Sequence, residues 1–119
     1  MAERRMFIYM ITNKSNNKKY IGRTCNNINT RLKQHFSDSK YIKNNCPLHE
    51  DMKKYDKNQF EISIIFEFEA NNYFDADTIE LEMIEKYNTF YPKGYNKRRV
   101  KRNGWKKLLL FKIKRYIFW

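Results

Sequence analysis

The stretch MFIYMITNKSNNKKYIGRT, residues 6–24, decides the fold of this chain. Met6–Ile11 is aromatic and β-branched, and Tyr20–Thr24 is a second short run of similar character. The residues between them, 12–19, are Thr, Asn, Lys and Ser, which favour turns. Two such runs around a polar turn predict a β-hairpin, although the loop is too long for turn type alone to fix its register.

The segment after the hairpin predicts a helix from Asn27 to about Ser39. Its apolar residues recur every four positions and form one stripe: Ile28, Leu32 and Phe36. Either Asn27 or Asn29 can cap the start of this helix. Arg31 and His35 are also four residues apart, so we expect them to share a neighbouring face.

Three further segments extend the pattern. Pro47 suits the first turn of a second helix that runs to about Tyr55, with an apolar face made of Leu48, Met52 and Tyr55. The segment 60–68 alternates and predicts a strand, with one face made of Phe60, Ile62, Ile64, Phe66 and Phe68. Asp75–Tyr87 predicts a third helix with Asp75 near its N-cap, followed by a loop over residues 88–96.

These elements predict an α+β domain in the order β-β-α-α-β-α. Three short strands with helices packed on them indicate a small three-stranded antiparallel sheet flanked by helices, followed by a basic C-terminal tail. At 119 residues, the chain has the length of a single domain.

The charge of the chain is high and uneven. There are 25 Lys and Arg against 13 Asp and Glu, a formal net charge of +12. Residues 97–119 hold ten of these basic residues and no acidic residue. We therefore divide the chain into a catalytic domain, 1–96, and a basic and apolar C-terminal extension, 97–119. The charge favours a polyanionic partner, with nucleic acid first and an acidic membrane surface second.

Cys25 and Cys46 are too few for a disulfide framework. The first residues do not resemble a secretory leader, and no apolar run reaches the roughly 18 residues that a membrane span needs. We expect an intracellular protein, in the cytoplasm or nucleus of a host cell, that is neither secreted nor membrane-spanning.

The sequence lacks the common catalytic signatures. It has no Gly-rich phosphate loop, no CxxC pair, no HExxH zinc motif and no pattern typical of a Ser or Cys nucleophile. Polar groups with catalytic chemistry instead lie on the hairpin, the first helix and the last helix: Tyr9, Tyr20, Arg23, Arg31, His35 and Glu80.

Five short elements occur in a defined order: Phe7-Ile8-Tyr9, Tyr20-Ile21-Gly22, Arg31-Leu32-Lys33-Gln34-His35, Glu80-Leu81-Glu82-Met83-Ile84 and Gly94-Tyr95-Asn96. Together they resemble the GIY-YIG nuclease superfamily, with its paired strand motifs, its Arg-x-x-x-His helix, its metal-binding Glu and its closing Gly-Tyr-Asn. The region around Cys46-Pro47-Leu48 is similar to the linking helix of viral and phage members. The resemblance spans roughly residues 6 to 96. Phe7 departs from it by standing where the family name has Gly.

The resemblance implies an endonuclease that hydrolyses DNA phosphodiester bonds with a single divalent metal, Mg²⁺ or Mn²⁺, and no small-molecule cofactor. Glu80 is then the metal ligand, because one carboxylate is enough for a Mg²⁺ that keeps mostly water and phosphate ligands. Glu82 is its rival, but two residues rotate a helix by about 200°, so only one of them faces the site. The spacing to Ile84 favours Glu80.

The other implied roles fall on the hairpin and first helix. Arg31 is a permanent, forked cation suited to the scissile phosphate, with Arg23 in support. Tyr9 is the candidate general base or water-positioning group, and its pKa of about 10 must then fall under a nearby positive charge. His35 takes the relayed proton or holds a phosphate, and Tyr20 orients.

Several neighbouring residues carry smaller expectations. Gly22 is structural and lets backbone or phosphate approach closely. Asn96 closes the site by hydrogen bonding and contacts DNA. His49, on the second helix, is expected at the surface.

The tail beyond the resemblance predicts DNA backbone contacts. Residues 97–107 carry seven basic residues in eleven, which would add salt-dependent and sequence-blind affinity. The predicted DNA-binding residues are Asn96, Lys97, Arg98, Arg99, Lys101 and Arg102. Residues 105–119 mix apolar and basic residues, so packing on the core, a membrane-surface segment and a partner-binding tail all stay open.

An endonuclease is the first functional hypothesis. The second is a non-catalytic DNA-binding module with the same fold and an idle site. A third, a basic protein that acts at a membrane surface through residues 105–119, ranks below both. The target DNA, the oligomeric state and the biological setting, whether a mobile element, a virus or repair, stay open.

Overall fold

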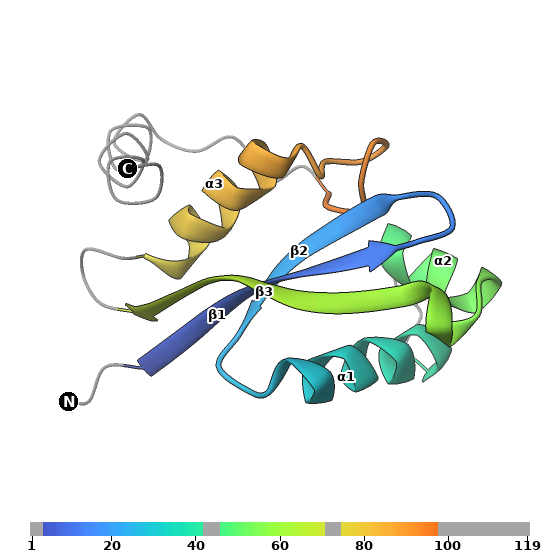
Figure 1. The fold of residues 1–119 in the computed structure, drawn as a ribbon, viewed down its shortest axis with the longest axis horizontal. Helices are drawn as coiled ribbons and strands as arrows, with labels where there is room; N and C mark the ends of the chain where they lie inside the picture. The colour runs from blue at the N-terminus through green and yellow to red at the C-terminus, as the bar shows by residue number, and fades with distance from the viewer. Residues whose placement is uncertain (1–3, 42–45, 71–74, 98–119) are drawn as a thin grey trace.

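A computed structural model of the chain describes residues 4–41, 46–70 and 75–97 (Figure 1). The elements are β1 Arg4–Asn13, β2 Lys18–Thr24, α1 Ile28–Tyr41, α2 Pro47–Lys54, the 3-10 helix η1 Lys57–Gln59, β3 Phe60–Ala70 and α3 Ala76–Tyr87. The predicted α+β class and element order are therefore confirmed. The expectations for Arg98 and the rest of the tail lie outside the described residues.

The three strands form one antiparallel sheet in the order β2-β1-β3, so β1 is central. The Asn-rich turn closes the hairpin, because the Asn17 N–H donates to the Asn13 carbonyl at 2.7 Å. Asn17 has a φ of 61°, a left-handed conformation that Asn tolerates better than most residues. This turn sets the register in which Tyr9 pairs with Gly22.

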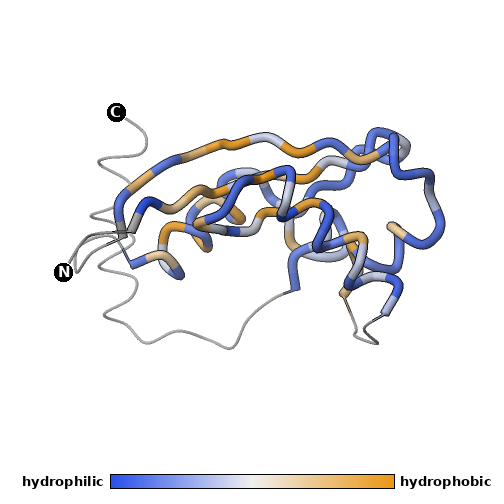
Figure 2. Tube along the Cα trace, turned by 90° about the horizontal axis from the view of Figure 1, so that it is seen from below, coloured by the Kyte–Doolittle hydropathy of each residue, from blue (hydrophilic) through white to orange (hydrophobic). Residues whose placement is uncertain are grey.

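Helices cover both faces of the sheet. One face packs against α3 in a buried cluster of Ile8, Ile21, Phe68, Ile79, Met83 and Ile84. The other packs against α1 and α2 in a cluster of Tyr9, Ile11, Phe36, Leu48, Met52, Phe60 and Tyr95. Figure 1 shows α3 and α1 on opposite sides of the strands, and Figure 2 shows hydrophobic residues running along the strands.

Strand β3 contains a β-bulge. Phe66 pairs with Ile8 of β1, and Ile64 pairs with the next residue, Tyr9, which leaves Ile65 as an extra residue. A bulge of this kind inserts one unpaired residue and changes which side the following residues face.

The bulge corrects the expected one-sided strand. We expected one face to be made of Phe60, Ile62, Ile64, Phe66 and Phe68. Phe60 and Ile62 do pack on the α1 and α2 side, but Phe66 and Phe68 pack on the α3 side, and Ile64 is 43% exposed. The prediction was wrong because β3 supplies apolar side chains to both clusters.

Side-chain caps fix the starts of α1 and α3. The Asn27 Oδ1 accepts the backbone N–H of Asn29 at 2.8 Å, so Asn27 is the cap of α1. The Asp75 Oδ1 accepts the backbone N–H of Asp77 at 3.1 Å, as the predicted N-cap of α3. Both contacts satisfy backbone donors that the first helical turn leaves open.

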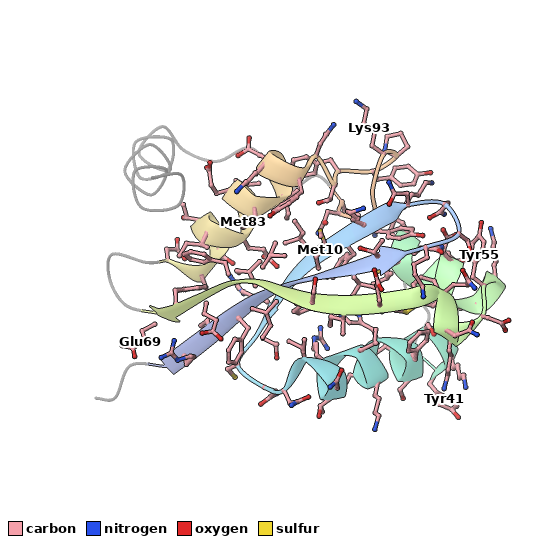
Figure 3. The ribbon with its side chains drawn as sticks, viewed as in Figure 1. Met10, Tyr41, Tyr55, Glu69, Met83 and Lys93 are labelled. Atoms are coloured by element: carbon pink, nitrogen blue, oxygen red, sulfur yellow. The ribbon has the colours of Figure 1, made fainter. Side chains whose placement is uncertain are left out.

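Helix α2 begins at Pro47 as expected, but its apolar face is shorter. Leu48 and Met52 are buried, whereas Tyr55 follows the helix in an extended conformation and is 36% exposed. Figure 3 shows Tyr55 at the periphery, while Met83 lies between α3 and the sheet. Among the described residues, no helix has the length and apolar character to cross a membrane.

Candidate active site

The two hairpin tyrosines lie on the same face of the sheet. Tyr9 pairs with Gly22, and Tyr20 pairs with Ile11, and cross-strand partners of an antiparallel pair project to the same side. The ring centroids of Tyr9 and Tyr20 are 6.4 Å apart. Gly22 makes this packing possible, because a Cβ on it would clash with the Tyr9 hydroxyl and come within 3.0 Å of the Tyr20 ring. The group that approaches Gly22 is thus a phenol.

His35 of α1 joins these two phenols. Its Nε2 is 2.8 Å from the Tyr9 hydroxyl, and its ring lies 5.4 Å from that of Tyr20. Tyr9 is fully buried and His35 is 3% exposed. The predicted helix spacing places His35 against the sheet, while its neighbour Arg31, one turn earlier, is only partly buried.

His49 of α2 is the residue that the sequence reasoning missed. It was expected at the surface, but it is buried, and its Nε2 is 3.0 Å from the Nδ1 of His35. The contact depends on how α2 packs against α1, which no local spacing reveals. Tyr9, His35 and His49 therefore form a continuous hydrogen-bonded chain beneath the surface.

Charged side chains on two helices change the pKa of the Tyr9 phenol. Burial raises the pKa of Tyr9, the Arg31 guanidinium lowers it by its charge and by a hydrogen bond, and the Glu80 carboxylate raises it. Burial, followed by Tyr9 and Glu80, also raises the pKa of Tyr20. Arg31 on α1 and Glu80 on α3 thus act on the same phenol from opposite faces of the sheet.

Both histidines are held in the neutral state. Burial, together with the nearby charges of Arg31 and His49, lowers the pKa of His35 to about 3. Burial also lowers the pKa of His49, against a raising effect of Asp38. At neutral pH each imidazole therefore carries one N–H and one acceptor nitrogen, as a hydrogen-bonded chain requires.

Glu80 lies within the fold on α3. Its side chain is 5% exposed and is not part of the lining of the pocket described below, which α3 reaches through Ile84. Glu82 is also buried, at 2% exposed. The carboxylate whose charge raises the pKa of both tyrosines is that of Glu80, and its role as the metal ligand stays a prediction.

A hollow of about 400 Å³ opens beside these groups. Its lining includes Tyr20, Arg31, His35, Asp38, Cys46, Pro47, His49, Ile84, Tyr95, Asn96 and Lys97. Tyr20 and Arg31 line it, whereas Tyr9 is fully buried and does not. The hollow brings together residues from β2, α1, α2, α3 and the closing loop.

Arg23 is not brought to this hollow. It pairs with Ile8 in the sheet, on the side covered by α3, and forms an ion pair with Asp77. The Arg23 Nη1 lies 2.5 Å from the Asp77 Oδ1. Arg23 therefore ties β2 to α3 near Glu80 and does not line the pocket.

Asn96 closes the edge of the sheet. Its Oδ1 accepts the Ile21 N–H at 2.8 Å and the Thr89 hydroxyl at 2.7 Å, and its Nδ2 donates to the Ile21 carbonyl at 2.8 Å. The expected hydrogen-bonded closure is thus present, and it is made with backbone of β2. A contact of Asn96 with DNA stays a prediction.

A family model for the GIY-YIG catalytic domain matches residues 5–96 of this sequence. The chain belongs to the GIY-YIG family. Its fold is similar to that of the catalytic domain of homing endonuclease I-TevI, with a TM-score of 0.63 and 28% identity, covering 79% of this chain and 99% of that one. A mutant of the catalytic domain of intron endonuclease I-TevI matches with a TM-score of 0.61 and 28% identity, over 83% and 99% of the two chains.

A viral protein is also similar to this GIY-YIG chain. The MSV199 domain-containing protein 146R of Invertebrate iridescent virus 6 is 31% identical over 86 residues. The match covers 72% of this chain and 35% of that protein, so the chain spans about a third of the length of this curated relative.

The donor set of this GIY-YIG nuclease domain limits the metal that it can hold. Among residues 4–41, 46–70 and 75–97, no group of three or more His, Cys, Asp or Glu side chains is placed to surround an ion. His35 and His49 direct nitrogens at each other, which suits a hydrogen bond. The single carboxylate of Glu80, whose charge acts on both phenols, fits a hard cation that keeps water and phosphate as its other ligands.

Proposed function

We propose that this GIY-YIG domain is an endonuclease that hydrolyses DNA phosphodiester bonds with one divalent metal, Mg²⁺ or Mn²⁺. The observation that carries the proposal is the Tyr9 phenol, which contacts His35 while the charges of Arg31 and Glu80 both act on it. The endonuclease activity named for I-TevI, whose catalytic domain shares this fold, supports it.

Arg31 and Tyr20 bind the substrate in this proposal. Both line the 400 Å³ hollow, so the scissile phosphate lies there, against the forked guanidinium of Arg31. The charge that develops on the phosphate oxygens in the transition state is stabilised by a cation that is already in place. Tyr20, with its raised pKa, stays protonated and donates its hydroxyl proton to the phosphate or to the attacking water.

The buried chain provides a route for a proton. For Tyr9 to act as a base it must first lose its own proton, and the His35 Nε2 at 2.8 Å accepts it. His35 then releases the proton on Nδ1 to the His49 Nε2 at 3.0 Å, and His49, which lines the hollow, releases its other ring proton to solvent, so that both imidazoles return to the neutral state. The low pKa of His35 means that it passes the proton on and does not hold it.

Glu80 is the residue that would hold the metal. A bound divalent ion supplies a positive charge that polarises the phosphate and lowers the pKa of a coordinated water. The same position places that charge near both phenols, where it would lower their pKa values against the effect of burial.

Plasmid nicking with Mg²⁺ tests the proposal through Glu80→Ala and Arg31→Ala. We expect each to lower the nicking rate about 100-fold or more, the scale seen when one charge-stabilising group is removed. Both variants should keep the fold and DNA binding. Glu85→Ala is the matched control, because Glu85 lies on the same helix with an exposed side chain, and it should cut like the wild type. Cutting by Glu80→Ala at the wild-type rate would refute the site.

Two further proposals concern the residues that contact DNA and the C-terminal limit of the catalytic domain. The predicted DNA-contacting residues are Asn96, Lys97, Arg98, Arg99, Lys101 and Arg102, and the catalytic domain is taken to end at residue 96. The alternative function, a DNA-binding module without activity, predicts that the wild type binds DNA, fails to nick it with either metal, and is unaffected by Glu80→Ala.

A further inference from the structure

A second hollow adjoins the first. It has a volume of about 800 Å³ and is lined by Lys18, Pro47, Glu50, Asp51, Lys54, Tyr91, Tyr95 and Lys97. Three of these residues, Pro47, Tyr95 and Lys97, also line the 400 Å³ hollow that holds Tyr20, Arg31 and His35. The two hollows therefore adjoin along these three residues. We call the larger one the flanking groove.

The acidic residues of the flanking groove already have partners. Glu50 forms an ion pair with Lys53 at 3.5 Å. Asp51 accepts the Tyr95 hydroxyl at 2.6 Å and the Asn16 amide at 3.2 Å. Lys53 offsets the charge of Glu50, while Asp51 keeps its negative charge, so the three lysines of the lining leave the groove with an excess of positive charge.

The lysines of the flanking groove differ from its acidic residues in their interactions. Within the described part of the chain, no ion pair joins Lys18, Lys54 or Lys97 to an acidic residue. They come from the start of β2, the end of α2 and the segment after the closing loop. Three elements thus bring three ammonium groups to one depression, which favours a polyanion.

The flanking groove also offers an aromatic ring. Tyr91 lies in its lining and is 56% exposed, so more than half of this residue is open to solvent. An unpaired base stacks on an exposed aromatic ring whatever its identity. Lysines around an exposed ring are a combination that fits a nucleotide better than it fits an acidic peptide or a lipid headgroup.

We propose that the flanking groove holds the DNA strand next to the scissile phosphate, with backbone phosphates on Lys18 and Lys54 and a base against Tyr91. The proposal rests on the function proposed above, since it takes the scissile phosphate to lie at Arg31. It adds a sequence-blind subsite within the folded domain, apart from the residues of the basic tail beyond Lys97. Its volume lies in the range of roughly 300–1,000 Å³ typical of ligand sites.

The test compares two charge-reversed variants of equal net charge. Lys18→Glu/Lys54→Glu changes the flanking groove. Lys33→Glu/Lys40→Glu is the control, because both lysines line a different hollow that shares no residue with the active site. Fluorescence anisotropy with a duplex of about 30 base pairs that carries a short single-stranded end, in EDTA and over a KCl series, measures binding without cleavage.

We expect the groove variant to bind at least tenfold more weakly than the control. Each phosphate contact contributes about 0.9 to the slope of log affinity against log salt, so the slope for the groove variant should be smaller by up to about 1.8. Tyr91→Ala should weaken binding with the salt slope unchanged. Should the charge reversals disturb folding, Lys18→Gln/Lys54→Gln gives the same comparison with a smaller effect.

Equally weakened binding in the groove variant and the control would overturn the inference, since net charge alone would then explain binding. The proposed endonuclease activity is tested separately, by plasmid nicking. A wild type that fails to nick plasmid with Mg²⁺ or Mn²⁺ contradicts the proposed endonuclease, while a binding difference between the two variants still supports the subsite.

Discussion

The buried histidine pair is the feature at the residue scale that sets the acid behaviour of the protein. The pKa of His35 falls from its usual 6.5 to about 3 in the folded chain, and that of His49 is lowered too. Between about pH 6.5 and about pH 3, the unfolded chain binds a proton at His35 that the folded chain does not bind. The contribution of neutral His35 to the free energy of unfolding is therefore fully present above about pH 6.5, and it is lost progressively as the pH falls.

His35→Gln should flatten this dependence. We expect the wild type to lose about 2 kcal/mol of unfolding free energy from this one residue between about pH 7 and about pH 5, and the variant to lose correspondingly less. Urea unfolding at the two pH values measures both. Parallel decreases in the wild type and the variant would show that His35 does not titrate as the structure indicates.

At the same scale, the sequence was informative where a motif spans short distances. Tyr9, Tyr20, Arg31, His35 and Glu80 could be selected through the resemblance to the GIY-YIG superfamily. Spacing added only that Arg31 and His35 share a helix face, and the sheet register places Tyr9 and Tyr20 on one side. His49 could not be selected in this way. Its burial depends on the packing of α2 against α1, and its contact with His35 joins residues 14 positions apart through space.

At the scale of the elements, the edge strand β2 is held on both of its sides. One side of it pairs with β1, and the other side is held by the closing loop through Asn96 and through the Tyr95 N–H, which donates to the Lys19 carbonyl at 2.8 Å. Because Tyr20 and Gly22 lie on β2, this loop also fixes the wall of the active site.

Asn96→Ala should loosen that edge. It leaves the buried Ile21 N–H and carbonyl and the Thr89 hydroxyl without this partner, and each buried polar group costs about 1–3 kcal/mol when unsatisfied. We expect a decrease of about 3 kcal/mol in unfolding free energy and faster amide exchange at Ile21. Asn26→Ala, with an exposed side chain, is the control. An unchanged Ile21 exchange rate would contradict the assigned role.

The strands and helices themselves could be predicted because their periodicities are clear and their caps are of the expected types. The bulge in β3 could not, since the alternation of Phe60–Phe68 looks regular. The available signal was the unbroken apolar run Ile64-Ile65-Phe66, which departs from strict alternation. Whether such a run forms a bulge depends on β1, because side chains on both faces of β1 pack with apolar side chains of β3.

The whole molecule combines a domain of low net charge with a strongly basic extension. Residues 97–119 hold ten of the 25 Lys and Arg, so the chain's excess positive charge lies mainly outside the matched region 5–96. We expect the extension to add affinity for DNA and the domain to supply the chemistry.

Replacing Arg98, Arg99, Lys101 and Arg102 together by Gln tests this division. The salt slope of DNA binding should fall by about 0.9 for each phosphate that the variant no longer binds, up to about 3.6. The nicking rate at saturating DNA should stay near that of the wild type. A salt slope equal to that of the wild type would remove these residues from the DNA-binding surface.

The bulge at Ile65 also has a meaning for sequence alignment. Eleven residues of β3 oppose ten of β1, so removing Ile65 leaves every other side chain of the strand on its present face. Deletion of a residue elsewhere in the strand exchanges the faces of the residues that follow it. A relative whose third strand is shorter by one residue is therefore expected to carry its gap opposite Ile65, and to keep the rest of the strand in step.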